Sequence, residues 1–307
     1  MVFGNKAVDF GHFMLDKSQR DALVASTLGV SKWIRRCLGG DGFLNGDMGW
    51  CLWLNGISPA ELRTMPAITE RVELVRQERL RSKKLSTRES AKFPTLFGED
   101  RQPDAAFLVI PKVSSERRHY VPLGFLTPDY ITTPSVLVVP GATLFDLGVL
   151  QSTMHMAWMR YTCGRLESRY QYSNTIVYNN FPWPESPDAK HRAAIETAAQ
   201  AVLDARAAFP DSTLADLYDP LSMPPALVKA HQTLDRAVDA AYVAAEKAAG
   251  RKAPRLGTDA ERVAFLFERY QQLTSLLPAG KARPKSPRRV ARASRPIKDA
   301  DARGSDG

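Results

Sequence analysis

A stiff segment, Phe181-Pro182-Trp183-Pro184, divides this chain into two parts of different character. Each proline fixes its own φ angle and lacks an amide N–H, so neither a helix nor a sheet can continue through the segment. Before it, short apolar runs lie between turns rich in Gly, Pro and Ser. After it, the sequence is rich in alanine and has helical periodicity. We therefore expect an α+β fold, with a mixed strand and helix domain over residues 1–185 and a small all-α helical domain over 186–279.

The first part contains four apolar runs that predict strands, because turn-forming residues bound each of them. They are Trp50–Leu54, Phe107–Ile110, His119–Val121 and Val136–Val139. A short helix is expected over 18–28 and a turn at 43–46. A single long helix is expected over 143–163, where apolar residues recur every three or four positions and Gly164 can end the helix.

The second part predicts three helices, over 187–209, over 225–249, and after a capping box at Thr258–Glu261. The stretch 280–307 lacks the apolar residues of a core and is expected to be a disordered basic tail. Of the 42 Lys and Arg and 33 Asp and Glu in the chain, residues 281–307 hold nine and three, which leaves 33 against 30 for the rest. Any contact with DNA must therefore come from local basic patches.

One candidate patch is a helix that is predicted after Pro66. Its basic residues surround a single apolar stripe and are Arg71, Arg76, Arg79, Arg81, Lys83 and Lys84. A helix of this kind more often presents a solvated face than a DNA contact. In a chain that binds DNA, Lys83 and Lys84 become candidates for neutralising phosphates.

A second candidate patch is the polar segment 114–118, which is expected to form a hairpin loop. Arg117 and Arg118 in this segment can contact DNA phosphates or base edges. The alternative is that both side chains belong to a solvated turn, and the spacing does not favour one interpretation over the other.

The segment 167–172 predicts a recognition strand. A period of two places three polar side chains on one face and two tyrosines on the other. The polar face holds Glu167, Arg169 and Gln171. Carboxylate, guanidinium and amide groups are those that read base edges in a DNA groove. The alternative, an exposed strand with mixed charges on its solvent face, is the more common arrangement in proteins.

Motifs for catalysis and for cofactors are not found in the sequence. Gly39–Gly42 does not follow a convincing strand, as a site for S-adenosylmethionine would require, and Asn180–Trp183 lacks the second proline of an adenine-binding loop. The five His and three Cys have no metal-ligand spacing. No apolar run approaches the roughly 18 residues of a membrane span. We expect a cytoplasmic protein without a cofactor in this chain.

Taken together, these segments resemble the C-terminal half of type IIL (Mme-type) restriction-modification enzymes and related adenine-specific DNA methyltransferases. The motifs that carry the resemblance are MVFGNKAVDFG, WCLWL, FPTLFGEDRQPD, IPKVSSERRHYVPLGFL, STMHMAWMRYTCGRLESRY and NTIVYNNFPWP. The resemblance implies that residues 1–185 are a DNA target-recognition domain and that the following helices are the C-terminal domain of such an enzyme. It also implies that the methyltransferase and nuclease regions, with S-adenosylmethionine, precede Met1 or belong to a separate chain.

The resemblance further implies that Glu167 and Arg169, the pair that follows Gly-Arg-Leu, read bases. A carboxylate accepts from cytosine N4 and a guanidinium donates to guanine O6 and N7, so the pair suits one C·G base pair. We expect the chain to recognise double-stranded DNA for a site-specific adenine-N6 methyltransferase, without being catalytic by itself. The alternatives are a free-standing methyltransferase and a non-enzymatic DNA-binding remnant or regulatory protein.

Overall fold

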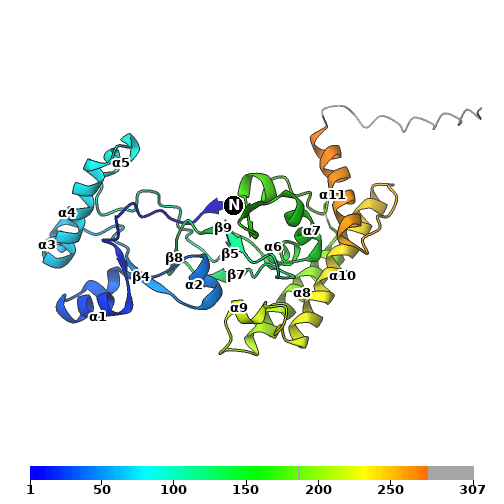
Figure 1. The fold of residues 1–307 in the computed structure, drawn as a ribbon, viewed down its shortest axis with the longest axis horizontal. Coiled ribbons are helices and arrows are strands. Elements are labelled where there is room, and N and C mark those ends of the chain that lie inside the picture. The colour runs from blue at the N-terminus through cyan, green and yellow to red at the C-terminus, as the bar shows by residue number, and fades with distance from the viewer. Residues whose placement is uncertain (186, 276–307) are drawn as a thin grey trace, which may run out of the picture. The chain divides into compact units, whose positions relative to one another are not determined.

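Three small sheets organise the first part of the chain in the computed structural model, which describes residues 1–185 and 187–275 (Figure 1). The first sheet is antiparallel and has the order β1-β9-β5-β7. Its strands are β1 (Val2–Phe3), β5 (Phe107–Pro111), β7 (Gly124–Leu126) and β9 (Val136–Pro140). The strands expected at 107–110 and 136–139 are therefore confirmed.

Both faces of the central strands β5 and β9 of this first sheet are buried. Side chains alternate between the faces along each strand. One face joins the largest hydrophobic core through Leu108, Ile110, Leu137 and Val139. The other face packs around Phe43 of helix α2 (Gly40–Asn45) through Phe107, Val109, Val136 and Val138. Burial on both faces explains why these strands have continuous apolar sequences.

The second sheet has the order β2-β4-β3-β8, and its β3–β8 pair is parallel. Its strands are β2 (Met14–Leu15), β3 (Ile34–Leu38), β4 (Gly49–Leu52) and β8 (Tyr130–Thr132). The helices around it are α1 (Lys17–Ser26), the 3₁₀ helix η1 (Val30–Trp33), α3 (Pro59–Arg63), α4 (Pro66–Arg81) and α5 (Leu85–Ser90). The expected strand at 50–54 and helix at 18–28 are confirmed. The turn expected at 43–46 is instead the end of α2, which Gly46 closes with a φ of 74°.

The basic helix α4 differs from its prediction at Arg79, which is fully buried. Its guanidinium group donates to five backbone carbonyls, those of Ala7, Val8, Ser90, Phe93 and Leu96. The loop at residues 7–8, and the end of α5 with the loop that follows it, thus find hydrogen-bond donors in one side chain. Arg79 stabilises the fold and is not available to DNA.

The helix expected over 143–163 is two helices, α6 (Leu144–Leu150) and α7 (Thr153–Thr162). The break lies at Gln151 and Ser152, where the Ser152 side chain accepts from the His155 amide and caps α7. A serine that caps a helix favours a new start over continuation. The apolar periodicity continues across the break, because Leu147, Leu150, Met154 and Trp158 all belong to one core.

The second part of the chain is helical, as expected, and α8 and α10 pack side by side (Figure 1). Its helices are α8 (Ala189–Ala207), α9 (Leu214–Leu217), α10 (Pro225–Ala248) and α11 (Asp259–Thr274). Thr258 and Glu261 form the expected reciprocal cap of α11, and Gly250 follows α10 with a φ of 69°. The short α9 was not predicted. The tail expected over 280–307 lies outside the described residues.

A hydrophobic cluster joins these helices to the first sheet. Leu227, Leu234 and Val238 of α10 belong to the same core as Leu108 and Leu137. Residues 1–273 accordingly form one unit by their contacts. The domain boundary at residue 185 remains a prediction.

Candidate nucleic-acid interface

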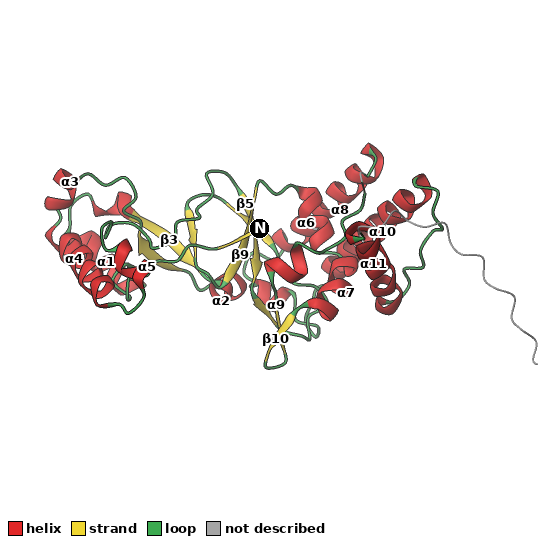
Figure 2. Ribbon diagram, turned by 90° about the horizontal axis from the view of Figure 1, so that it is seen from above, coloured by secondary structure: helices red, strands yellow, loops and turns green. Residues whose placement is uncertain are grey.

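The predicted recognition strand is a β-hairpin. Strand β10 (Gly164–Leu166) pairs antiparallel with β11 (Arg169–Gln171), which in turn pairs with β6 (Val113–Ser114). The chain reverses at Glu167, whose φ of 58° lies in the left-handed region. The expectation of a continuous strand over 167–172 is therefore wrong, because its first two residues form the turn. Figure 2 shows the hairpin projecting beyond the helices around it.

The turn brings together the two residues that were predicted to read bases. An Arg169 Nη2 atom lies 2.8 Å from Glu167 Oε2, and the two side chains are 46% and 77% exposed. In a continuous strand, these two side chains would also have been on the same face, but they would have been farther apart. An ion pair this exposed contributes little to the stability of the fold, so both side chains are available to bind a ligand.

The base of the hairpin is fixed by two buried tyrosines, which the alternating pattern placed opposite the polar face. The hydroxyl of Tyr172 lies 2.8 Å from His155 Nε2 in the core. Burial lowers the pKa of His155 to about 3, so this ring is neutral at neutral pH. The Tyr170 ring is also buried, and the Arg165 guanidinium lies 4.2 Å from its centre. A firm base holds the exposed turn in one place.

A hollow of about 630 Å³, called here the hairpin hollow, lies beside β11. It brings together Arg169 and Gln171 of the hairpin with Arg118 of the 115–123 loop. Lys112 lines the same hollow, as do Asp41 and Asn45 of α2 and the loop residues Pro134 and Ser135. Ser135 Oγ accepts from the Gly40 amide at 2.9 Å and ties that loop to α2.

The charge of the hairpin hollow is mainly positive, since Lys112, Arg118 and Arg169 face Asp41. Arg118 is half-buried, and its guanidinium lies 3.3 Å from Ser114 Oγ. Burial lowers the pKa of Arg118, and the carboxylate of Asp219 opposes this change. A guanidinium group stays protonated in proteins, so the hollow presents fixed positive charge.

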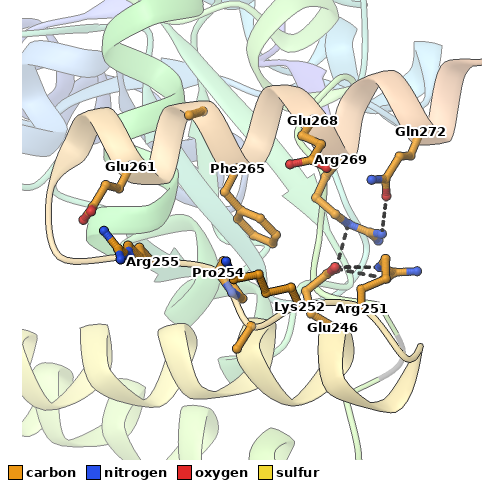
Figure 3. A pocket seen from close by; sticks show the side chains of 12 residues that line it. Glu246, Arg251, Lys252, Pro254, Arg255, Glu261, Phe265, Glu268, Arg269 and Gln272 are labelled. Carbon is orange, nitrogen blue, oxygen red and sulfur yellow. Dashed lines mark hydrogen bonds and ion pairs between the residues drawn. The ribbon is translucent and has the colours of Figure 1, made fainter. Parts of the chain in front are cut away.

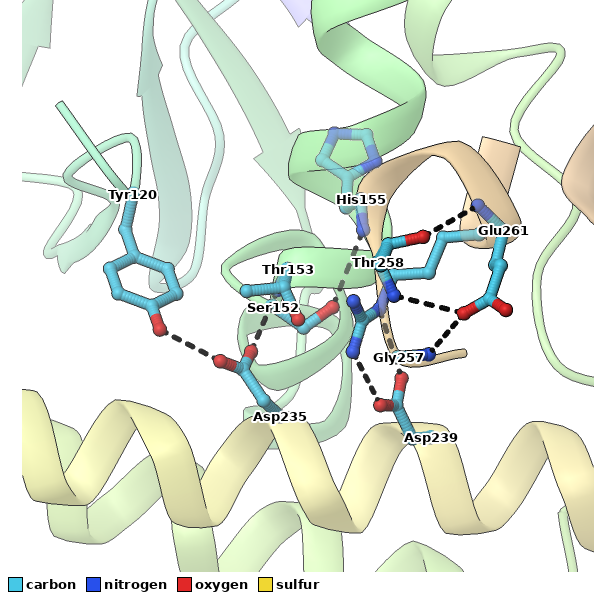
Figure 4. A network of polar contacts seen from close by, with 10 residues as sticks. Tyr120, Ser152, Thr153, His155, Asp235, Asp239, Gly257, Thr258 and Glu261 are labelled. Carbon is cyan, nitrogen blue, oxygen red and sulfur yellow. Dashed lines mark hydrogen bonds and ion pairs between the residues drawn. The ribbon is translucent and has the colours of Figure 1, made fainter. Parts of the chain in front are cut away.

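The loop that carries Arg117 and Arg118 is held by the C-terminal helices (Figure 4). The Tyr120 hydroxyl donates to Asp235 Oδ2 of α10 at 2.7 Å, and Asp235 Oδ1 accepts from the Thr153 amide at 2.7 Å. The Tyr120 ring also stacks on His231, with 4.0 Å between ring centres.

The strand expected at 119–121 does not form, because side chains bind the carbonyl groups that a strand would pair. Gln151 Nε2 donates to the Val121 carbonyl at 3.2 Å. Arg160 Nη2 of α7 donates to the His119 carbonyl at 3.2 Å, and Arg206 Nη1 donates to the carbonyl of Leu123, just after the expected strand, at 2.5 Å. Once these acceptors are occupied, the loop needs no neighbouring strand.

The remaining predicted contacts lie in different places. Arg117 is exposed beside Arg118 in the loop but does not line the hairpin hollow. Lys83 and Lys84 are exposed at the junction of α4 and α5 and also lie outside the hollow. The phosphate-binding role of these lysines remains a prediction.

The sequence did not identify Lys112 as part of the hairpin hollow, nor the residues of α2 and Ser135 that line it. Lys112 directly follows a buried strand and precedes the predicted polar loop, which is a signal that could have been used. Ser135 and Asn45 are ordinary turn residues in the sequence, and only the tertiary structure brings them to the hairpin.

A second hollow, between α10 and α11, contains a charge network (Figure 3). Glu246 lies 2.6 Å from Arg251 Nε and 3.3 Å from Arg269 Nε. Glu185, at the end of the proline segment, binds the same two arginines at 3.0 and 2.6 Å. Arg251 and Arg269 are thus already paired with carboxylates, which makes this network a connection between segments.

No group of three or more His, Cys, Asp or Glu within the described residues could hold a metal ion. Among these same residues, no helix is both long and apolar enough to cross a membrane. Asn180 begins the segment 180–183, which lacks the second proline of an adenine-binding loop. Its side chain donates to the carbonyls of Thr175 and Ile176 in the π-helix Asn174–Tyr178.

The chain thus combines an α+β region that carries a basic hairpin hollow with a helical region that holds the loop of that hollow. The chain belongs to the MmeI family: residues 1–185 match the model of the MmeI target recognition domain, and residues 187–278 that of the MmeI C-terminal domain. The resemblance to type IIL restriction-modification enzymes is therefore confirmed.

Two relatives extend this finding. The chain is 32% identical over 272 residues to DNA methyltransferase A of Bacillus subtilis (strain 168), covering 89% of this chain and 30% of the relative. It is 44% identical to the type IIL restriction-modification enzyme MmeI, solved in complex with DNA, with a TM-score of 0.83 over 90% of this chain and 35% of that one. The chain thus spans about a third of the length of each relative.

Proposed function

We propose that this chain recognises a specific sequence in double-stranded DNA and thereby positions a site-specific adenine-N6 DNA methyltransferase. The observation that carries the proposal is the hairpin hollow, where Arg169, Gln171, Arg118 and Lys112 meet beside the Glu167 turn. The similarity of the chain to MmeI, whose structure was solved in complex with DNA, supports duplex DNA as the ligand.

The exposed pair at the hairpin turn supplies the base-reading chemistry of this proposal. Glu167 accepts from cytosine N4, and Arg169 donates in fork geometry to guanine O6 and N7. Because the two side chains are already adjacent, they fit the two partners of one C·G pair. Gln171 and Arg118 lie in the same hollow and contact neighbouring bases or phosphates.

Methyl transfer belongs, in this proposal, to a methyltransferase region or chain other than this sequence, and that region binds S-adenosylmethionine. The chain described here reads the duplex in the cytoplasm, while its partner extrudes and methylates the adenine. A nuclease region is a further expected partner, as in other restriction-modification proteins.

The test is selection of a motif from a randomised duplex pool by the purified chain, followed by the same selection with two variants. Arg169→Ala is expected to relax discrimination at one C·G position by about 1–3 kcal/mol, because the fork to guanine is lost. Lys83→Ala is the matched control, since it should weaken all duplexes alike and leave the motif unchanged. An equal loss of affinity across all sequences for Arg169→Ala would contradict the base-reading role.

A further inference from the structure

The short helix α2 contributes two polar side chains to the hairpin hollow, those of Asp41 and Asn45. The two residues are four positions apart, so they lie on one face of the helix, and both are exposed. The residues between them face the protein, since Leu44 is buried and Phe43 packs against the first sheet. One face of α2 is thus anchored in the fold, and the other is presented to the hollow.

Close contacts hold α2 in place at both ends. At its start, the Gly40 amide donates to Ser135 Oγ at 2.9 Å. At its end, the Gly46 amide donates to the Gly42 carbonyl at 2.9 Å. A Cβ atom at Gly42 would lie 2.4 Å from the carbonyl oxygen of Asp47, so the helix packs directly on the backbone of the loop that follows it. A polar side chain on an element held this firmly has the fixed position that reading one base requires.

A hydrogen bond orients the Asn45 amide group. Asn45 Nδ2 donates to Asp41 Oδ1 at 2.7 Å. Because an ionised carboxylate only accepts hydrogen bonds, the NH₂ group of the amide is the one that faces Asp41. Among the described residues, the second N–H and the carbonyl oxygen of Asn45 have no hydrogen-bond partner. The amide therefore keeps one donor and one acceptor for a ligand.

One donor together with one acceptor is the complement of adenine in the major groove. Adenine presents an acceptor at N7 and a donor at N6, and an Asn amide pairs with both of them. Guanine presents two acceptors, N7 and O6. Since Asp41 already holds one N–H of Asn45, the amide has a single N–H left and cannot satisfy both acceptors of guanine.

The charge of α2 favours contact with a base over contact with a phosphate. Asp41 forms no ion pair within the described part of the chain, although Lys112, Arg118 and Arg169 line the same hollow. A carboxylate without a cation partner repels a phosphate group. The three cations are therefore the groups of this hollow that suit the DNA backbone or guanine, and α2 suits a base edge that offers a donor.

We propose that Asn45 reads an adenine of the same duplex that the hairpin reads, and that Asp41 is a positioning residue that leaves Asn45 a single donor. This inference rests on the proposed function. It adds an A·T position to the motif, next to the C·G position assigned to Glu167 and Arg169. Asn45 and Arg169 line one hollow of about 630 Å³, so the two positions belong to one motif.

The experiment selects a motif from a randomised duplex pool with the full chain and with three variants. Asn45→Ala should lower the preference for adenine at one position about tenfold, because both hydrogen bonds to the base are lost, and should leave the C·G position unchanged. Arg169→Ala should show the reverse pattern. Asp41→Ala frees the second N–H of Asn45, so guanine should be accepted at the adenine position as well.

Asn55→Ala is the matched control. Asn55 is also exposed and also donates to a carboxylate, Asp100 Oδ2 at 3.1 Å, but it does not line the hairpin hollow. It should select the wild-type motif. Urea unfolding of Asn45→Ala should resemble that of the wild type, because the replaced side chain is exposed.

The two proposals fail in different ways. A wild-type motif in Asn45→Ala, or an equal loss of affinity for all sequences, would overturn the adenine-reading role alone. An unchanged preference for adenine over guanine in Asp41→Ala would overturn the positioning role of Asp41. A wild-type chain that selects no motif would overturn the proposed function and this inference with it.

Discussion

Glu167 is a residue where backbone strain and proposed chemistry coincide. Its φ of 58° is a conformation that favours glycine over a side chain with a Cβ. Glu167→Gly should therefore keep or slightly raise the stability of the hairpin, while discrimination at the C·G position falls by about 1–3 kcal/mol. Urea unfolding and motif selection with the full chain measure the two effects separately.

Glu167→Ala is the partner variant for this prediction, because it also removes the carboxylate but keeps a Cβ in the strained backbone conformation. Both variants should lose the same discrimination and differ only in stability. If Glu167→Gly keeps full discrimination at the C·G position, the carboxylate does not read a base.

The sequence shows which residues of a helix are charged, but it does not show which of them are buried and which are exposed. Arg79 and Arg76 look alike in a basic helix, yet one is buried among carbonyl groups and the other is exposed beside Glu73. The difference arises from two distant loops that need hydrogen-bond donors, which no helical periodicity can reveal. Arg169, in contrast, lies on the polar side that the alternation predicts, because its buried neighbour Tyr170 fixes which way the strand faces.

At the scale of elements, the loop that carries Arg117 and Arg118 owes its position to α10. Tyr120→Phe removes the hydroxyl that donates to Asp235 and should weaken DNA binding roughly fivefold, about 1 kcal/mol, because Arg118 is then less firmly placed. If Tyr120 acts through Arg118, the loss in the double variant with Arg118→Ala should not exceed that of Arg118→Ala alone. Affinities measured by fluorescence anisotropy complete this cycle.

Tyr242→Phe is the matched control for the loop. It removes another buried hydroxyl, which donates to the Pro182 carbonyl at 2.7 Å, far from Arg118 in the sequence. It should lower stability without changing DNA affinity. Strict additivity of Tyr120→Phe and Arg118→Ala would show that Tyr120 does not position the arginine.

The elements that the sequence predicts correctly are those with a periodic buried face. Strand β9 and helices α8 and α10 lie within a few residues of their expected bounds, since packing and propensity agree there. The failures occur where a single polar group decides the local structure. Ser152 divides one apolar stripe into two helices, and Glu167 turns one predicted strand into a hairpin.

At the scale of the whole molecule, the charge network around Glu246 and Glu185 connects the proline segment to α10 and α11. The guanidinium groups of Arg269 and Arg251 lower the pKa of Glu185 below its usual 4.5. A carboxyl group with a lowered folded-state pKa stabilises the protein above its usual pKa, and this contribution is lost as the pH falls through the lowered value.

Glu185→Gln should therefore be less stable than the wild type at about pH 7, and the difference should shrink at acid pH, once the pH falls through the lowered pKa of the wild-type carboxyl group. Urea midpoints of the full chain at both pH values provide the measurement. Glu268→Gln is the control, because Glu268 lines the same hollow but forms no ion pair among the described residues (Figure 3). A difference between wild type and Glu185→Gln that stays constant over this pH range would mean that the ion pairs of Glu185 contribute nothing. The hydrophobic core and the Tyr242–Pro182 hydrogen bond would then hold the proline segment to the helices.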